Sequence, residues 1–262
     1  MIEIDGSRLP EHVSYSSLTT WLDCGWKYYL SRVEEIQEVP SWYLLGGTTL
    51  HKATELYDLH GSDDIEKLWE KCWKETIDET LKNTTTTMDK WKAGGRPSKT
   101  YPNKEDDKWW SKNGPKQLEK WVQFRSGSWS ILDIDGSPAV ELDIQPVIAG
   151  VPVKMQIDRV MVTPDGEVVV VDIKSGRSIP TWLQLAFYAA GLEKTYGIKP
   201  QWGTYWMSRS GITSAFVNLD EFPTGGIEFL VAQFDKARRN DVFLPNLSHC
   251  SKCGLSDKCK WK

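Results

Sequence analysis

The stretch GEVVVVDIKSG, residues 166–176, decides the fold. Its four consecutive valines are typical of a β-strand that is buried on both faces. The strand ends in Asp172, Ile173 and Lys174. A surface salt bridge between Asp172 and Lys174 is the simplest interpretation, but it does not explain why a run of buried valines should end in charged residues.

The residues before this strand predict a hairpin. Pro-Asp-Gly at 164–166 suits a three-residue loop, a type I turn closed by a left-handed glycine. Such a loop pairs Thr163 with Glu167 and, further along, Asp158 with Asp172, with Cβ atoms about 5 Å apart on one face. Lys174 projects from the same face because strand side chains alternate. A slip of one residue would turn Asp158 away.

Two carboxylates and a lysine on one face of a sheet predict a metal site. Adjacent anions repel, and a divalent cation removes that cost, with oxygen ligands that suit Mg²⁺ or Mn²⁺. The cation can polarise a phosphodiester and lower the pKa of a bound water. Lys174 can position that water and offset developing charge.

Three further residues are candidates for this site. His51 and Glu55 lie four residues apart, on one face of an expected helix. A neutral imidazole binds Mn²⁺ well, although either residue taken alone is more often structural. Glu141 is a weaker candidate, which a tight turn at Ala149-Gly150 would bring alongside Asp158.

The spacing of apolar residues predicts the remaining elements. We expect helices at 14–30, with a break at 23–25, and at 47–57, 65–81, 182–195 and 227–239. We expect strands at 140–147, 151–163, 167–174, 203–207 and 213–219. Residues 83–116, rich in Thr, Gly, Pro, Asn and Lys, are predicted to form a long loop. This order predicts an α/β fold, bordering on α+β, with a mixed central sheet.

Composition narrows the classes of protein. The chain has 262 residues, 40% of them hydrophobic and 26% charged, as expected for a globular protein. No apolar run approaches the roughly 20 residues that span a bilayer, and the N-terminus shows no secretory signal. Five cysteines, an odd number, argue against a disulfide framework. We therefore expect a cytoplasmic protein that does not enter a membrane.

A net charge of −4 does not indicate nucleic-acid binding by the whole chain. Between residues 90 and 120, however, lysines and arginine alternate with aromatic residues, which suits phosphate contacts combined with base stacking. The candidates for contact with DNA are Lys90, Lys92, Arg96, Lys99, Trp109 and Trp110. The alternative is a solvated insertion whose tryptophans pack on the core.

Five motifs in this order resemble the PD-(D/E)XK nuclease superfamily. They are SYSSLTTWLDCGWKYYL (14–30), GTTLHKATE (47–55), QIDRV (156–160), VVDIKSG (170–176) and QLAFY (184–188). The likeness is to the RecB-like branch, which includes the RecB and AddB nuclease domains and CRISPR-associated RecB-like exonucleases. The segment 60–138 carries no motif of the branch.

The resemblance implies a single nuclease domain over 1–262, with a restriction-endonuclease-like core, an insertion at 60–138 and a C-terminal cysteine tail at 241–262. It implies a metal-dependent DNA exonuclease, 5′→3′ on single strands or DNA ends, in repair, recombination or CRISPR adaptation. It also implies a bacterial, archaeal or phage-encoded protein, with recombination, helicase or CRISPR adaptation proteins as its partners. The implied metal ligands are His51, Asp158, Asp172 and the Ile173 carbonyl. Lys174 would act on water, and Gln184 and Tyr188 would position the site.

The cysteines remain to be placed. Cys250, Cys253 and Cys259 form an incomplete tetrahedral set, and the resemblance implies Cys24 as fourth ligand of a [4Fe-4S] cluster. Zn²⁺ is the alternative, with His249 able to replace Cys24. Cys72, on an apolar helix stripe, is expected to be a core thiol.

Two functions are alternatives to a DNA exonuclease. They are a structure-specific endonuclease that uses the same site and a non-catalytic DNA-binding scaffold.

Overall fold

A mixed sheet lies at the centre of this computed structural model, which describes residues 9–223 and 225–262. Its strands are β1 (Ser130–Ile131), β4 (Val140–Ile144), β7 (Met155–Val162), β8 (Val168–Lys174), β9 (Trp202–Met207), β10 (Ile212–Thr213) and β11 (Val217–Asn218). The order is β1-β7-β8-β9-β10, with β4 also paired to β7 and β11 to β9. Val169, Val170, Val171 and Ile173 are fully buried, as predicted for a strand covered on both faces.

The predicted register between β7 and β8 is confirmed. The two strands are antiparallel, with Val162 opposite Val168 and Arg159 opposite Val171. The Thr163 N–H donates to the Glu167 carbonyl at 2.9 Å. The next step along this ladder sets Asp158 against Asp172. Strand β9 runs parallel to β8, so the sheet is mixed and the predicted fold class is confirmed.

Three predicted strands are interrupted. The first ends at Ile144, before Pro146, which has no N–H to continue a ladder; a hairpin of β5 (Val147–Ile148) and β6 (Val151–Pro152) follows. The second resumes as β7 at Met155. The third divides into β10 and β11, because the Ser214 hydroxyl between them accepts the Tyr205 N–H at 3.1 Å. A further short hairpin joins β2 (Asp133–Ile134) to β3 (Ser137–Pro138).

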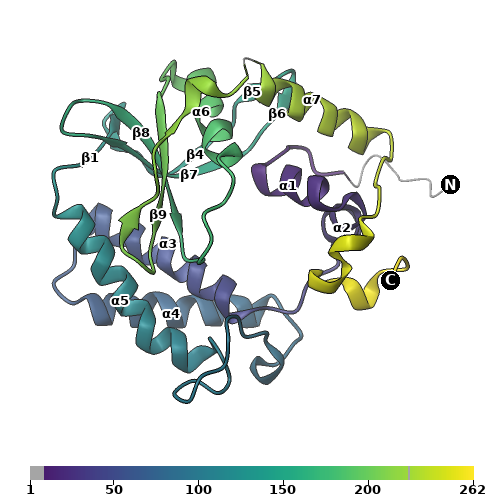
Figure 1. Ribbon diagram of the computed structural model, residues 1–262, viewed down its shortest axis with the longest axis horizontal. Coiled ribbons are helices and arrows are strands. Elements are labelled where there is room, and N and C mark those ends of the chain that lie inside the picture. Colours follow the sequence, from purple (N-terminus) through teal and green to yellow (C-terminus); the bar gives the residue numbers. More distant parts are fainter. Residues whose placement is uncertain (1–8, 224) are drawn as a thin grey trace.

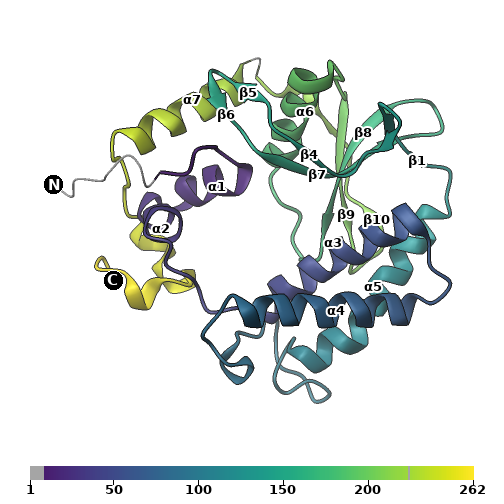
Figure 2. The same cartoon turned by 180° about the vertical axis from the view of Figure 1, so that it is seen from behind.

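Helices cover both faces of the sheet (Figures 1 and 2). One face packs on α3 (Trp42–His60), α4 (Ile65–Lys82) and α5 (Asp107–Arg125). The other packs on α1 (Tyr15–Asp23), α2 (Gly25–Tyr28), α6 (Leu183–Tyr196) and α7 (Gly226–Arg239). The helices predicted at 65–81, 182–195 and 227–239 are confirmed to within one residue or two, and Cys24 supplies the expected break after α1. Helix α3 begins five residues earlier than predicted.

Helix α5 corrects the prediction of a loop over 83–116. Asp106 caps it by accepting the Trp109 N–H at 3.1 Å, and Trp110 and Trp121 bury its inner face completely. Gly114 and Pro115, which indicated a loop, lie inside the helix. A Cβ at Gly114 would come within 1.9 Å of the Trp69 ring. This glycine therefore allows α4 and α5 to approach closely, and residues 107–116 are helical.

The N-terminal helices and the C-terminal tail lie side by side (Figure 1). The π-helical turn η2 (Tyr29–Val33) extends α2, and the tail consists of the 3₁₀ turns η5 (Leu247–Lys252) and η6 (Ser256–Lys258). Two further 3₁₀ turns are not part of this region: η3 (Met88–Lys90) lies between α4 and α5, and η4 (Leu219–Glu221) follows β11. The Trp26 N–H donates to the Leu244 carbonyl at 3.3 Å. Trp21 packs on Phe234 of α7. The part of the chain described here contains no helix long and apolar enough to cross a membrane.

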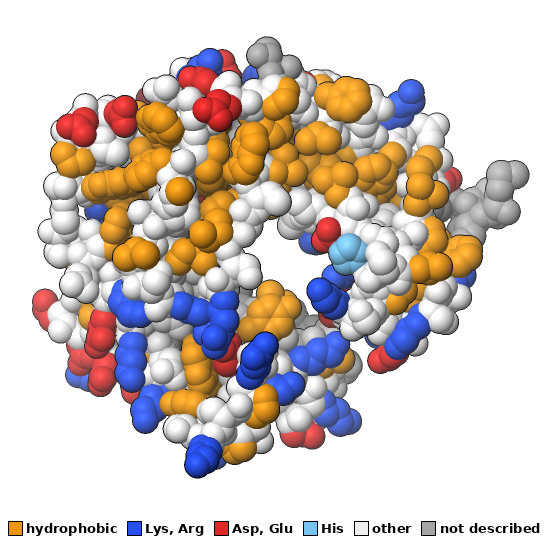
Figure 3. All heavy atoms as spheres, viewed as in Figure 1, with side chains coloured by type: hydrophobic (Ala, Val, Ile, Leu, Met, Phe, Trp, Pro, Cys, Tyr) orange, Lys and Arg blue, Asp and Glu red, His pale blue; other side chains and the backbone are white. Residues whose placement is uncertain are grey.

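An opening passes through the molecule (Figure 3). The sheet and helices α3 to α5 border it on one side, and α1, α2 and the tail border it on the other (Figures 1 and 2). Residues 34–41, between η2 and α3, join the two sides. Lys and Arg side chains gather below and to the left of the opening in Figure 3.

Candidate active site

Three potential metal ligands line a pocket that also includes Tyr15 and Ser16 of α1, the helix on the other side of the opening. His51 from α3, Glu141 from β4 and Asp158 from β7 each offer an atom, and these atoms lie within 4.8 Å of one another. His51 Nδ1 lies 3.3 Å from Glu141 Oε1 and 3.4 Å from Asp158 Oδ1. In the described chain no other set of three His, Cys, Asp or Glu residues meets this criterion. Glu141, the weaker candidate from sequence, therefore lies beside the stronger ones.

A second set of residues continues the site along β8 and α6. Lys174 Nζ lies 2.6 Å from Asp172 Oδ2 and donates to Gln184 Oε1 at 2.9 Å. Gln184 Nε2 donates to Tyr188 Oη at 2.8 Å. The Ile173 N–H donates to Asp158 Oδ2 at 2.6 Å, which ties this set to the first. The structure thus brings together all the residues predicted for the metal and catalytic site.

The carboxylates and His51 shift one another's pKa values. Burial and the negative charge of Asp158 raise the pKa of Asp172 to about 7. Burial opposes charge on His51, but Asp158 and Glu141 outweigh it and raise the His51 pKa well above 6.5. Burial also opposes ionisation of Asp158, yet His51 and the Ile173 N–H lower its pKa. A cation bound by His51 must therefore displace a proton.

These residues fit a divalent cation. Among the described residues, the buried Asp172 Oδ1 has no hydrogen-bond partner. A buried carboxylate oxygen without a partner is costly, and a metal ion would supply the missing contact. Oxygen donors together with one imidazole suit Mn²⁺ or Mg²⁺. The pocket that holds the site has a volume of about 950 Å³, and Glu55 and Lys52 also line it.

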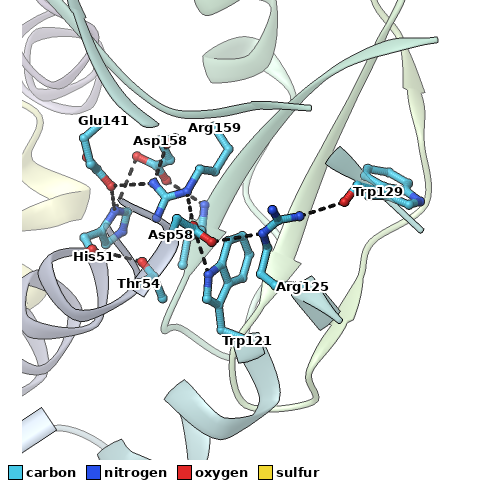
Figure 4. A network of polar contacts seen from close by, with 10 residues as sticks. His51, Thr54, Asp58, Trp121, Arg125, Trp129, Glu141, Asp158 and Arg159 are labelled. Carbon is cyan, nitrogen blue, oxygen red and sulfur yellow. Dashed lines mark hydrogen bonds and ion pairs between the residues drawn. The ribbon is translucent and has the colours of Figure 1, made fainter. Parts of the chain in front are cut away.

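A buried ionic network lies behind the site (Figure 4). Arg159 is fully buried and donates to Glu141 Oε1 at 3.2 Å and to Asp58 Oδ2 at 2.7 Å. Asp58 also accepts from Arg125 Nε at 2.9 Å and Trp121 Nε1 at 3.1 Å. Sequence reasoning missed Arg159 and Asp58. The only signal was a second charged residue, Arg159, directly after Asp158 in a strand whose other residues are apolar except for Gln156.

Replacing Arg159 with Met should destabilise the protein by about 3–5 kcal/mol, because Asp58 and Glu141 would lose a buried partner. Urea unfolding in EDTA measures this change. Arg125→Met is the matched control, since it removes another guanidinium from Asp58 but leaves Glu141 paired. A free energy of unfolding for Arg159→Met within error of the wild-type value would show that the network does not support the site.

The six residues predicted to contact DNA differ in their exposure to solvent. Trp110 is fully buried against Trp69 and Trp73, so the prediction that it stacks on bases is wrong. Trp109 packs on Trp110 at 4.9 Å and is half-buried. Its packing supports the alternative that these tryptophans belong to the core. Four predicted phosphate contacts are exposed and stay predictions: Lys90, Lys92, Arg96 and Lys99.

The four cysteines predicted to bind a cluster line one pocket of about 220 Å³ between α2 and the tail. Cys24 Sγ accepts the N–H of Asn246 at 3.3 Å, and His249 Nδ1 lies 2.8 Å from Asn246 Nδ2. The thiols are not among the described groups with ligand atoms within 4.8 Å of one another. Neither the predicted iron–sulfur cluster nor zinc is confirmed. Cys72 is fully buried, as predicted.

The match to a known family spans nearly the whole chain. Residues 12–260 match the model of the PD-(D/E)XK nuclease superfamily. The chain belongs to this superfamily. Nucleases of this superfamily use divalent metals, which agrees with the group formed by His51, Glu141 and Asp158. Finer placement of this PD-(D/E)XK nuclease in the RecB-like branch stays a prediction.

Two phage proteins and one solved structure are similar to this nuclease. The Gene 69 protein of Mycobacterium phage D29 is 27% identical over 94% of this chain and 95% of its own length. The Gene 69 protein of Mycobacterium phage L5 is 25% identical over 74% and 75%. A crystal structure from Eubacterium rectale, named "Putative exonuclease", aligns with a TM-score of 0.52 over 95% of this chain and 88% of that one. At 11% identity this alignment supports the fold alone.

Proposed function

We propose that this nuclease is a metal-dependent exonuclease that degrades single-stranded DNA from an end. The observation that carries the proposal is the opening beside the active site (Figure 3). A strand that reaches the carboxylates through a closed opening must enter by an end. The name of the solved relative agrees with this activity, but the geometry is the main support.

Two pockets meet along the proposed path of the strand. The pocket that holds His51 and Asp158 also includes Leu44 and Thr48 of α3. A second pocket, of about 910 Å³, shares these two residues. Lys27 and Arg32 line this second pocket, which gives it cations for backbone phosphates. The shared residues Leu44 and Thr48 place the two pockets next to each other along α3.

Each site residue has a proposed role. His51, Glu141, Asp158 and Asp172 would hold Mg²⁺ or Mn²⁺, with the Ile173 carbonyl as a further ligand. The ion would polarise the scissile phosphate and supply a nucleophilic water. Lys174 orients that water and offsets charge on the phosphate. Gln184 and Tyr188 hold Lys174 in place through the hydrogen-bonded chain from α6.

A topological test separates an exonuclease from an endonuclease. Linear single-stranded DNA should be degraded with Mg²⁺ or Mn²⁺, and a covalently closed circle of the same sequence should remain intact. Opening the circle at one site should restore degradation, which is the matched control. Cutting of the closed circle at the linear rate would favour the endonuclease. Binding of DNA without hydrolysis under either metal would favour the non-catalytic scaffold.

Polarity is tested with blocked ends. A 5′→3′ direction, which the family resemblance implies, predicts that a bulky group on the 5′ end stops degradation and that the same group on the 3′ end does not. The reverse result would assign 3′→5′ polarity and leave the proposed exonuclease activity standing. Quantifying shortened products on a gel distinguishes the two.

The cysteine pocket is proposed to hold a [4Fe-4S] cluster. What supports a shared metal centre is that all four thiols line this one pocket, and the family resemblance implies that the centre is a [4Fe-4S] cluster. Tetrahedral Zn²⁺ is the alternative. The cluster would join α2 to the tail, beside the opening.

A further inference from the structure

A side pocket adjoins the active site. It has a volume of about 310 Å³ and shares Tyr43, Ser175 and Gly176 with the pocket that holds the metal ligands. Glu105, Arg177 and Arg209 also line it. Arg177 follows Lys174 by three residues, so their Cα atoms lie at most about 11 Å apart. A substrate bound at Lys174 therefore extends readily into this side pocket.

The side pocket carries an excess of positive charge. Glu105 is buried, and its carboxylate accepts hydrogen bonds from the guanidinium group of Arg209 and from that of Arg177. The distances are 2.8 Å from Arg209 Nη2 to Glu105 Oε2 and 3.0 Å from Arg177 Nη2 to Glu105 Oε1. Two cations face one carboxylate, which leaves one positive charge for a ligand.

The surrounding residues fix this cluster in place. Arg209 stacks on Trp109 at 4.9 Å and donates from Nε to the Ser175 carbonyl at 2.8 Å. Gly95 has φ +74°, and a Cβ there would lie 2.6 Å from Glu105 Oε1. Glycine at this position therefore leaves the space that Glu105 occupies. Arg209 acts as a structural clamp for Glu105.

Arg177 differs from Arg209 in its exposure. The Arg177 side chain is 72% exposed, whereas that of Arg209 is 21% exposed. Glu105 engages only Nη2 of Arg177 in the contacts described here, so further donors face solvent. A guanidinium that is oriented on one side and open on the other suits a phosphate oxygen.

An exposed aromatic ring stands at the junction of the two pockets. Tyr43, in the first turn of α3, is 48% exposed and lines both pockets. Gly94 lies against it, since a Cβ at Gly94 would approach Tyr43 Cβ to 3.2 Å. Exposed aromatic rings beside cations are the usual components of single-strand binding surfaces.

We infer that Arg177 and Tyr43 form a subsite for the nucleotide next to the scissile phosphate. Arg177, oriented by Glu105 and Arg209, binds a backbone phosphate, and Tyr43 stacks on a base. The ligand class is a nucleotide of single-stranded DNA of any sequence, because neither contact reads a base edge. This subsite rests on the proposed function.

Binding of a fluorescent oligothymidylate in EDTA, where no hydrolysis occurs, tests the phosphate contact. Arg177→Gln should reduce the slope of log affinity against log salt by about 0.7, the value for one phosphate contact on a single strand. Arg177→Lys keeps the charge and should keep the wild-type slope. The matched control is Arg239→Gln, since Arg239 is 59% exposed and paired with Asp235 at 2.7 Å on α7; its slope should not change.

The aromatic contact has its own test. Tyr43→Leu should weaken binding about tenfold, within the range for loss of one stacked base, and Tyr43→Phe should bind like the wild type. A wild-type slope in Arg177→Gln, or equal affinities for the Leu and Phe variants, would overturn the subsite. Failure of the wild-type protein to bind the oligonucleotide would overturn the proposed function as well, so the two failures are distinguishable.

Discussion

Lys174→Ala should lower the rate of DNA hydrolysis by about 10²–10⁴-fold, the loss expected when a positioned electrostatic or acid–base group is removed. Lys174 Nζ contacts Asp172 and Gln184, and no other lysine described here contacts the site carboxylates at this distance. Degradation of end-labelled DNA with saturating Mn²⁺ measures the effect. Binding of DNA should persist, because Lys174 is proposed to act at the scissile phosphate alone and the other contacts along the strand remain.

Lys194→Ala is the matched control for this experiment. Lys194 lies on α6 and pairs with Glu228 at 3.5 Å, so the variant also removes a lysine from a carboxylate, but away from both pockets. It should hydrolyse DNA at the wild-type rate. Full activity in highly purified Lys174→Ala protein would rule out the proposed role of Lys174.

Asp172→Asn separates function from stability at the same site. The Asp172 pKa, raised to about 7, means that the folded protein favours the neutral acid. The stability that this group contributes is complete below about pH 4, its unfolded pKa, and is lost as pH rises through about 7. At pH 8 in EDTA, Asp172→Asn should therefore be at least as resistant to urea as the wild type. Its activity should nevertheless be lost with its metal ligand.

A less stable Asp172→Asn protein would contradict this explanation. It would mean that the ionised carboxylate stabilises the fold. The missing hydrogen-bond partner of Asp172 Oδ1 would then no longer indicate a metal ligand. Site residues are often retained against stability because their charges serve a reaction, and Asp172 is the clearest example in this chain.

The local sequence was sufficient to predict that Asp158, Asp172 and Lys174 lie together. The Pro-Asp-Gly turn fixes the length of the β7–β8 connection, and the alternation of strand residues then fixes which side chains meet. Asp158, Asp172 and Lys174 follow from these two rules. His51 was a candidate from its spacing to Glu55 and from the family resemblance. No sequence pattern could give its distance from Asp158, because that distance depends on how α3 packs on the sheet.

Other features depended on contacts that no local pattern records. Glu105, Arg177 and Arg209 meet across more than 100 residues of sequence, and Arg159 reaches Asp58 in the same way. Helix α5 was hidden because Gly114 and Pro115 usually break helices, while here Trp69 fills the space that Gly114 leaves. The opening depends on how residues 34–41 and the tail place α1 and α2, which single-sequence reasoning cannot address.

The cysteine pocket leads to the second large expected effect. Protein purified without oxygen should be brown and contain about four irons per chain if a [4Fe-4S] cluster is bound. Cys24→Ala should lose this iron as completely as Cys253→Ala does, because both thiols line the pocket. Inductively coupled plasma analysis and visible absorption measure the loss.

Cys72→Ala is the matched control, since Cys72 is fully buried on α4 and burial raises its pKa to about 11. It should keep all its iron. A centre that joins Cys24 to the tail closes a very long loop, so its loss should cost on the order of 5 kcal/mol by analogy with a cross-link. Anaerobic urea unfolding would reveal this cost. Colourless protein with one zinc per chain would exclude the cluster, and iron retained in Cys24→Ala would exclude Cys24 as a ligand and make His249 the next residue to test.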